Sequence, residues 1–243
     1  MAKEEKSFQN MIEEYNEIIA KDSKDSGAFM MRASTKEACG DYKGAMDDYN
    51  KSIKVGKNVM SLFLRGNLKV QLGDFKEGYK DVKKAISKGY DDAAAYSVLG
   101  LAKQGMGQFN DAIKEFDKAI KLQPDNSDYY HNRANTKRLQ KKFMQAIDDY
   151  KKALDIEKDK KDYIKFERSL CDMAVTMMQI NEFETALDNL NKALEIVPDD
   201  DIALYARGIL FVNMGAKDKA LNDFKKASSL GNQQATDWIN ENT

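Results

Sequence analysis

The strongest constraint on the fold is a pattern of small and large residues that returns about every 34 residues along the chain. The blocks that carry it begin at Ser26, Val59, Ala93, Ser127, Glu167 and Asp201. Their eighth and twentieth places hold only Ala or Gly, as in Ala33 with Ala45 and Gly66 with Gly78. Their twenty-fourth places are large: Tyr49, Val82, Phe116, Tyr150, Leu190 and Phe224. Small residues let two helix axes approach, and large ones fill the remaining space.

The block at 93–126 shows how each unit is expected to fold. Its apolar residues recur every three or four positions, which predicts two amphipathic helices. These residues are Tyr96, Leu99, Phe109, Ile113, Phe116 and Ile120. Gly107 lies between the two halves, where a left-handed residue ends the first helix without a Cβ clash. One helix pair cannot bury its apolar face alone, so such units are stable only when stacked.

The same block resembles a tetratricopeptide repeat. The resemblance rests on Tyr96, Leu99, Gly100, Ala112, Phe116, Ala119 and Pro124. It departs from the family pattern at Tyr96, where the family favours Trp, and at Lys103, where it favours Tyr. The resemblance implies an all-α, right-handed superhelical solenoid of antiparallel helix pairs, with six full repeats and a terminal helix at each end.

The predicted organisation has two caps and one interruption. The repeats are expected at 26–58, 59–92, 93–126, 127–160, 167–200 and 201–234. Apolar residues in 1–25 fall in the phase of a second helix, which predicts a capping helix there, with a frayed tail as the alternative. Trp238 marks a second cap at 235–243. An insert at 161–166 follows a block without a helix breaker, so its flanking helices are expected to be longer than the others.

Charge and cysteine content exclude several classes of partner. The formal net charge is −1 and the pI is about 6.0, so no basic field attracts nucleic acid or an anionic membrane. Cys39 and Cys171 fit no metal-binding spacing and are expected to be free thiols in a reducing compartment. No stretch has the length of a signal peptide core or a membrane span, which predicts a cytoplasmic protein without membrane insertion.

An Arg and an Asp at two fixed places of the block are either both present or both absent. Four blocks have Arg in the seventh place and Asp in the twenty-third: Arg32 with Asp48, Arg65 with Asp81, Arg133 with Asp149, and Arg207 with Asp223. The two blocks without the Arg have Glu115 and Asn189 in place of the Asp. Since the helices of a block are expected to be antiparallel, each Arg and Asp can form a structural ion pair.

The sequence offers little for catalysis. His131 is the only histidine, and Asp128, Asn132 and Asn135 are near it, but no nucleophile accompanies it. It is therefore expected to be a surface or groove histidine. No phosphate-binding loop, calcium loop, metal site or cofactor site is expected, and the aspartate clusters are interpreted as helix caps and solvated faces. The chain is predicted not to be an enzyme.

In tetratricopeptide proteins the first helices of the repeats line a concave groove that binds peptides. The corresponding candidates here are Met30, Met31, Met60, Phe63, Leu64, Asn67, His131, Asn132, Asn135, Arg168, Tyr205 and Ile209. Methionine-rich surfaces suit adaptable recognition of apolar side chains. The alternative is that many of these side chains pack against neighbouring helices and expose little.

These observations predict a non-enzymatic interaction module that binds a protein or peptide partner in its groove. An RNA-binding helical-repeat protein is a second possibility, although the balanced charge opposes it. A chaperone adaptor that recognises an acidic C-terminal tail is a third. Asn132 and Arg168 match its clamp residues, but Ser97, Leu101 and Asp172 do not. An enzyme that uses His131 is the remaining alternative.

Overall fold

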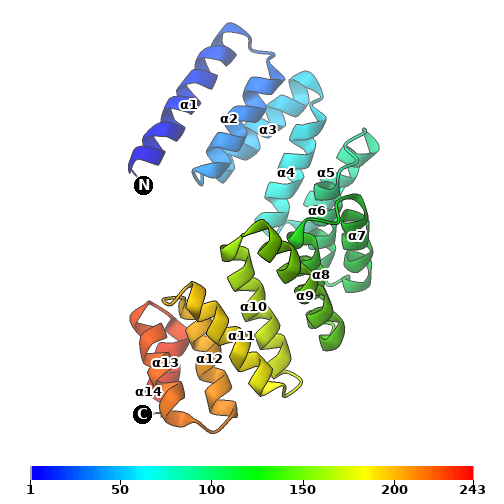
Figure 1. Cartoon of the computed structure of the whole chain (residues 1–243). Helices are drawn as coiled ribbons and strands as arrows, with labels where there is room; N and C mark the ends of the chain where they lie inside the picture. The colour runs from blue at the N-terminus through cyan, green and yellow to red at the C-terminus, as the bar shows by residue number, and fades with distance from the viewer. Residues whose placement is uncertain (1, 243) are drawn as a thin grey trace. The chain divides into compact units, whose positions relative to one another are not determined.

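The computed structural model describes the backbone of residues 2–242 and the side chains of residues 7–242. Met1 and Thr243, the outer ends of the two predicted caps, lie outside the described residues. The described chain is all helical, with fourteen helices and no strand (Figure 1). It divides after Gln123 into two compact units.

The first unit contains seven helices that succeed one another along the described chain. They are α1 (Ala2–Lys21), α2 (Ser26–Ala38), α3 (Tyr42–Gly56), α4 (Val59–Gln71), α5 (Phe75–Ser87), α6 (Ala93–Gly105) and α7 (Phe109–Leu122). Helix α1 packs on α2, and α2 pairs with α3, α4 with α5, and α6 with α7. Tyr49 and Leu68 are fully buried in its core, where they contact residues of neighbouring pairs.

The second unit repeats this arrangement within its own part of the described chain. Its helices are α8 (Ser127–Leu139), α9 (Phe143–Lys160), α10 (Tyr163–Met178), α11 (Phe183–Ile196), α12 (Asp201–Asn213), α13 (Lys217–Ser229) and α14 (Gln233–Asn242). Helix α8 pairs with α9, α10 with α11, and α12 with α13, while α14 packs on α13. Trp238 of α14 lies against Phe224 of α13, with ring centroids 4.2 Å apart.

Short polar side chains begin most of the first helices. Asp25, Asn58, Asp92 and Asp200 each accept a backbone N–H from the first turn of the helix that follows. These bonds satisfy donors that have no partner inside the helix. The aspartate pair at 91–92 and the run at 199–201 therefore contain helix caps, as the sequence indicated.

Many helices are followed by a residue in the left-handed conformation, and this residue is not always a glycine. Gly107 has φ 73° and separates α6 from α7, as predicted. Gly56, in contrast, is still the last residue of α3. The left-handed position is taken by the next residue, Lys57, with φ 50°.

Close approach of the paired helices explains the small residues. A Cβ added to Gly78 would lie 2.7 Å from the Gly66 carbonyl oxygen and 2.6 Å from Val70 Cγ2. Only glycine fits between α4 and α5 at this point. The equivalent alanines, such as Ala33 and Ala45, are completely buried, and so are the large residues of the twenty-fourth place.

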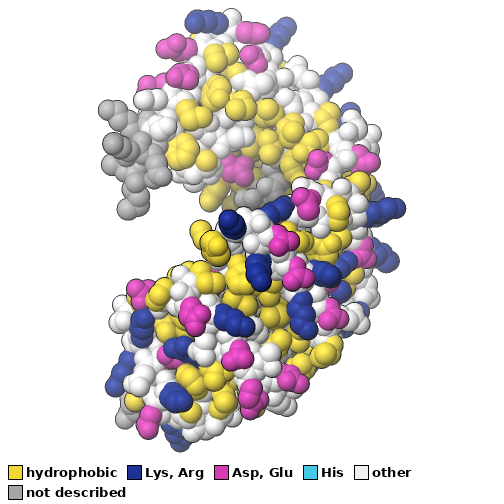
Figure 2. Space-filling model, viewed as in Figure 1, with side chains coloured by type: hydrophobic (Ala, Val, Ile, Leu, Met, Phe, Trp, Pro, Cys, Tyr) yellow, Lys and Arg dark blue, Asp and Glu magenta, His cyan; other side chains and the backbone are white. Residues whose placement is uncertain are grey.

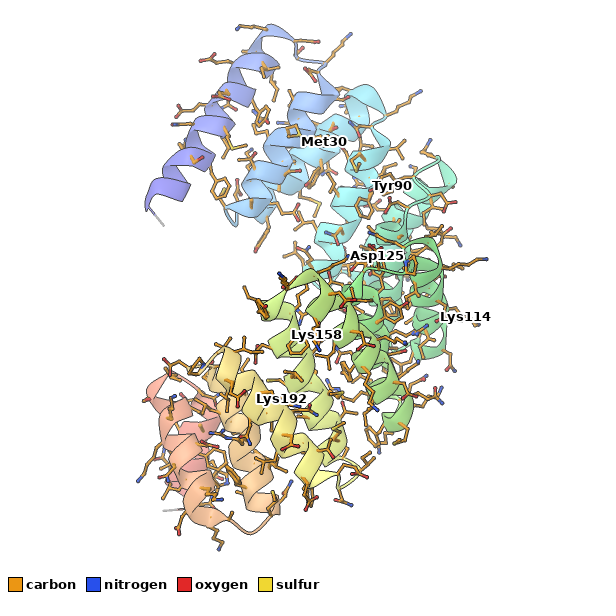
Figure 3. All side chains as sticks on the ribbon, viewed as in Figure 1. Met30, Tyr90, Lys114, Asp125, Lys158 and Lys192 are labelled. Atoms are coloured by element: carbon orange, nitrogen blue, oxygen red, sulfur yellow. The ribbon has the colours of Figure 1, made fainter. Side chains whose placement is uncertain are left out.

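The joint between α9 and α10 interrupts the regular spacing. Helix α9 has 18 residues and α10 has 16, against 13 to 15 in the other paired helices, so the predicted lengthening is confirmed. Helix α10 begins at Tyr163, inside the range read from the sequence as an insert. Lys160 near this joint forms an ion pair of 3.2 Å with Asp125, which Figure 3 labels.

The fold class expected from the sequence is confirmed: the described chain is all helical, and its helices pack in successive adjacent pairs. The number of repeats, their boundaries and the handedness of the stack stay predictions. No helix in the described part of the chain combines the length and the apolar character needed to cross a bilayer.

Candidate interaction surface

Four bidentate ion pairs join the two helices of their pairs. In each, the guanidinium Nε and Nη2 donate to both carboxylate oxygens of Asp48, Asp81, Asp149 or Asp223. The eight distances lie between 2.6 and 2.9 Å. The pairing predicted from co-occurrence of Arg and Asp is therefore confirmed in all four blocks.

The Arg and Asp side chains of these ion pairs have two further kinds of partner that were not predicted from the sequence. A lysine one turn after the Arg also reaches the carboxylate in three blocks: Lys36, Lys69 and Lys137, at 2.8, 2.7 and 2.6 Å. An asparagine on the preceding helix accepts the remaining Arg Nη1: Asn16, Asn50 and Asn191. Each aspartate is thus surrounded by donors, and the pair belongs to the architecture, not to a catalytic site.

In the first unit, the predicted groove residues form what we call the methionine face: Met30, Met31, Met60 and Leu64, on α2 and α4. Met31 and Met60 are 43% and 39% exposed, while Met30 and Leu64 are half-buried. Figure 2 shows hydrophobic side chains at the surface over these helices, and Figure 3 labels Met30. The half-buried Asn67 follows Leu64 on α4.

Phe63 is not an exposed member of this face. It is 8% exposed, and its ring lies 4.6 Å from that of Tyr90. Because α4 is packed between neighbouring pairs, the fifth place of its block turns into the core between them. The spacing of apolar residues alone could not distinguish burial of Phe63 from exposure, since both occur on a first helix.

In the second unit, the predicted residues are mostly polar and paired. Arg168 is exposed and lies 3.7 Å from Asp128, which also pairs with Lys165 at 2.7 Å. Asn135 accepts a hydrogen bond from the Tyr150 hydroxyl. The half-buried Asn132 completes this polar set.

Two of the predicted groove residues, both apolar and on α12, are only partly exposed to solvent. Tyr205 and Ile209 are half-buried and pack against the core of the second unit. The Tyr205 ring lies 5.7 Å from that of Phe224. Ile202, one turn earlier, is mostly exposed. The exposed apolar side chains of this helix therefore lie at its two ends, Ile202 in the first turn and Val212 in the last.

His131 was expected at the surface or in the groove, and this expectation is wrong. The side chain is buried, with Nδ1 3.1 Å from Ser169 Oγ and Nε2 3.0 Å from Asp172 Oδ2. These two polar partners on α10 explain how an imidazole can be buried. Ser169 in turn donates to Glu157 of α9, a residue that the sequence analysis did not select.

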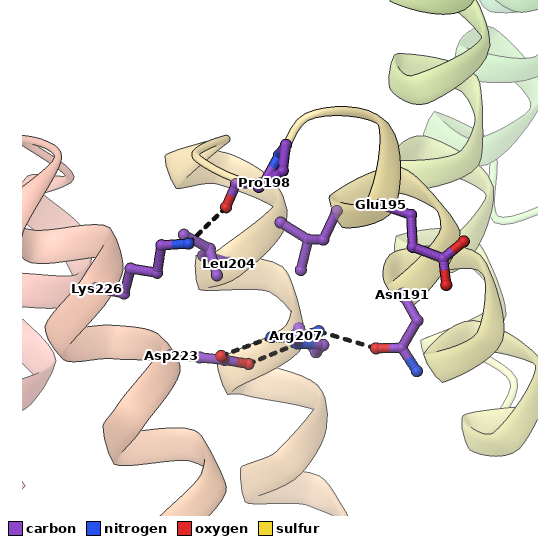
Figure 4. Close-up of a pocket in the computed structure, with 8 residues that line it drawn as sticks. Asn191, Glu195, Pro198, Leu204, Arg207, Asp223 and Lys226 are labelled. Carbon is purple, nitrogen blue, oxygen red and sulfur yellow. Dashed lines mark hydrogen bonds and ion pairs between the residues drawn. The ribbon is translucent and has the colours of Figure 1, made fainter.

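A hollow in the second unit lies between α11, α12 and α13 (Figure 4). Its centre is Arg207, which bonds to Asp223 and Asn191. Lys226 at its edge donates to the Pro198 carbonyl at 2.7 Å. The polar groups at its floor are therefore engaged with one another, and the hollow is explained by the repeating ion pair.

Neither cysteine has the surroundings of a reactive or metal-binding thiol. Cys39 is exposed, and Cys171 is buried with its Sγ 3.0 Å from Glu167 Oε1. Burial and the Glu167 carboxylate raise the pKa of the Cys171 thiol. Among the described residues, no group of three His, Cys, Asp or Glu side chains is arranged to hold a metal ion.

The comparisons with known proteins agree with this architecture. A family model described as TPR repeat matches residues 106–137 and 177–215, and one described as tetratricopeptide repeat matches residues 127–160. The chain is thus a helical-repeat protein. The repeats in the matched segments are tetratricopeptide repeats, so the resemblance noted in the sequence is confirmed. A comparison with curated proteins finds no match.

Solved structures of tetratricopeptide proteins share the fold. A tetratricopeptide repeat protein from Parabacteroides merdae ATCC 43184 is similar at 15% identity and a TM-score of 0.71, over 96% of this chain and 97% of that one. YrrB, described as a TPR protein with an unusual peptide-binding site, matches at 18% identity and 0.59, over 79% and 97%. MamA matches at 21% identity and 0.58, over 70% and 96%.

Proposed function

We propose that this chain is a non-enzymatic protein-interaction module that binds a peptide or helical segment on the side formed by its first helices. The observation that carries the proposal is the methionine face, where two exposed methionines lie beside half-buried apolar side chains. Unbranched thioether side chains can adapt to different apolar partners. The structural likeness to YrrB, which is described as having an unusual peptide-binding site, supports the same class of function.

The proposed surface is narrower than the residues selected from the sequence. Met31 and Met60 are its contact residues, and Leu64 and Met30 form its half-buried floor. Phe63 belongs to the buried cluster against which Leu64 packs. The charged side chains of α2 are engaged in ion pairs or hydrogen bonds: Arg32 and Lys36 with Asp48, and Glu37 with the Tyr49 hydroxyl. A segment with an apolar, uncharged contact side fits this surface best.

Within the second unit, considered by itself, the polar set is proposed as a separate contact surface for a partner. Arg168 and Asp128 offer one charge of each sign, and both are partly exposed. Asp172 is also partly exposed on α10. An anion at that place would repel an acidic tail, so the chaperone-adaptor alternative is disfavoured. The formal net charge of −1 likewise disfavours RNA.

An exposed free thiol at Cys39 supports a reducing compartment, and we propose the cytoplasm as the place where the module acts.

The test is a selection of peptides from a random displayed library on the whole chain, followed by affinity measurements on the selected peptides. We expect apolar sequences whose affinity falls about tenfold or more in the double variant M31S/M60S, because anchor contacts commonly contribute 2 kcal/mol or so. M144S is the matched control, since Met144 is 64% exposed on α9, a second helix. Equal affinity for both variants would place the binding surface elsewhere.

A further inference from the structure

Four polar side chains form a continuous hydrogen-bonded row inside the second unit, which we call the buried relay: Glu157, Ser169, His131 and Asp172. Ser169 Oγ lies 3.1 Å from Glu157 Oε1 and 3.1 Å from His131 Nδ1. His131 Nε2 lies 3.0 Å from Asp172 Oδ2. The first three side chains are buried, and only Asp172 reaches solvent.

The long helix α9 is what brings Glu157 into this row. Glu157 is the thirty-first residue of its block, a place that three other blocks fill with Gly56, Gly89 and Gly231 at or just after the end of the helix. In this block the helix continues to Lys160. The side chain of Glu157 is therefore presented from within a helix toward α10, where Ser169 lies.

Counting hydrogens shows that the relay needs one proton more than its ordinary charges supply. Ser169 has one hydroxyl hydrogen but lies between two groups, Glu157 Oε1 and His131 Nδ1. An ionised carboxylate only accepts, and a neutral imidazole whose Nε2–H donates to Asp172 accepts at Nδ1. With Glu157 ionised and His131 neutral, Ser169 can satisfy only one of its two neighbours.

Adding one proton satisfies every contact, and as long as the Asp172 carboxylate acts as an acceptor the proton can be placed in two ways. In the first, His131 is an imidazolium that donates to Ser169 and Asp172, while Ser169 donates to an ionised Glu157. In the second, a neutral Glu157 donates to Ser169, Ser169 donates to His131 Nδ1, and His131 Nε2 donates to Asp172. The two arrangements contain the same number of protons, and they differ only by transfer along the row.

We infer that Glu157 and His131 hold one buried proton between them through the Ser169 hydroxyl, and that its release as the pH rises loosens the packing of α8, α9 and α10. The inference concerns this joint and does not depend on the proposed binding function.

The surroundings of Glu157 favour retention of the proton. Burial raises the pKa of the Glu157 carboxyl, and the nearby hydroxyl groups of Ser169 and Ser127 and the charges of His131 and Arg168 oppose this effect without overcoming it. Its second oxygen, Oε2, is buried without a hydrogen-bond partner. The other titratable and charged groups near the relay are Arg138 on α8, Tyr150 on α9, Glu167 on α10 and Asp200 ahead of α12.

The chain is well suited to a direct test because His131 is its only histidine. We would label the whole protein with ¹⁵N-histidine and ¹³C-glutamate and record the ring nitrogens and the carboxyl carbons at about pH 7, near the middle of the range in which histidine titrates. The Glu157 signal is the one missing from E157Q. We expect either a doubly protonated ring or a protonated Glu157 carboxyl, with the other group in its complementary form.

A neutral ring together with an ionised Glu157 carboxylate at that pH would overturn the inference. If E157Q fails to fold, the unchanged protein still gives the contradicting result: a neutral ring with no protonated glutamate carboxyl in the spectrum at that pH.

The second arm measures the packing of the joint. Because the folded-state pKa of Glu157 is raised, its contribution to stability is present at low pH and is lost as the pH rises through that value. We expect the wild-type Tm, relative to that of E157Q, to fall as the pH rises above the ordinary range of a glutamate carboxyl, about 4 to 5. The Tm of E157Q should change less, since an amide donates at every pH.

E195Q, at an exposed glutamate of α11, is the control and should follow the wild type. Identical pH profiles for wild type and E157Q would contradict the loosening.

Discussion

Asp48 is the most enclosed of the four paired aspartates, and its chemistry shows why the pair is needed. The side chain is 1% exposed and receives Arg32 through two bonds and Lys36 through a third. Burial raises the pKa of the Asp48 carboxyl. The hydrogen bonds and charges of Arg32 and Lys36 together lower this pKa by more than burial raises it, so the net shift is downward. The ionised form is therefore the stable one in the fold.

Removing that charge should leave two cations without their acceptor. We expect D48N to lower the free energy of unfolding by about 3 kcal/mol, because breaking a buried pair leaves an uncompensated charge. Urea-induced unfolding followed by circular dichroism measures this difference. Its neighbour Asp47 is exposed, so D47N is a matched control that should change stability by about 0.5 kcal/mol or less. Similar losses in both variants would show that helix propensity, not the ion pair, is responsible.

The same aspartates predict how the protein responds to acid. Arg65 and Lys69 lower the pKa of Asp81 against its burial, as Arg32 and Lys36 do for Asp48. A depressed folded-state pKa means that the stabilisation is present above the unfolded pKa and is lost as the pH falls through the folded value. We expect Tm to fall steeply below about pH 4. D48N should flatten this part of the profile, and an unchanged slope would exclude Asp48 as a contributor.

At the scale of single elements, the contact between α4 and α5 is close enough to exclude a side chain at residue 78. The Gly66 carbonyl oxygen lies where a side chain at residue 78 would begin. G78A should therefore be destabilising, although alanine favours a helix over glycine by about 1 kcal/mol. Overpacking costs about 1–3 kcal/mol, and we expect a net loss of about 1–2 kcal/mol in thermal or urea unfolding.

Gly27 on α2 provides the comparison for that substitution. A Cβ at this position would meet only the Asp25 carboxyl oxygen, at 3.2 Å. G27A should therefore leave stability unchanged or slightly increased. If G78A is tolerated as well as G27A, the two helices can separate without cost, and the small residues of the eighth and twentieth places are not explained by close approach.

How far the sequence predicts each element depends on whether its partners obey the period. Arg133 and Asp149 could be paired in advance because both recur at fixed places in other blocks. Glu157 could not be placed beside His131, because it lies where the period breaks and its role has no copy elsewhere in the chain. The burial of Phe63 could not be decided for a different reason: periodicity locates a face of a helix, but burial depends on the neighbouring pair.

At the scale of the whole molecule, each helix pair is stabilised mainly by the pairs beside it, so the ends are expected to be the least stable parts. Among its described side chains, α1 has none that is buried, and Met11 and Ile18 are exposed. Helix α2, by contrast, buries four residues. We expect amide hydrogens of α1 to exchange faster than those of α2 in native-state hydrogen exchange. Equal protection of both helices would indicate that α1 unfolds only with its neighbour.

The contact between Trp238 and Phe224 gives the opposite end an optical signal of its own. Trp238 is the only tryptophan in the chain, so fluorescence excited at the indole band reports the docking of α14 on α13 and nothing else. Circular dichroism, in contrast, averages over all the helices. With Ala235 as the only buried residue of α14, the fluorescence transition should come at a lower denaturant concentration than the dichroism transition. The separation between the two curves would measure the cooperativity of the stack without any added label.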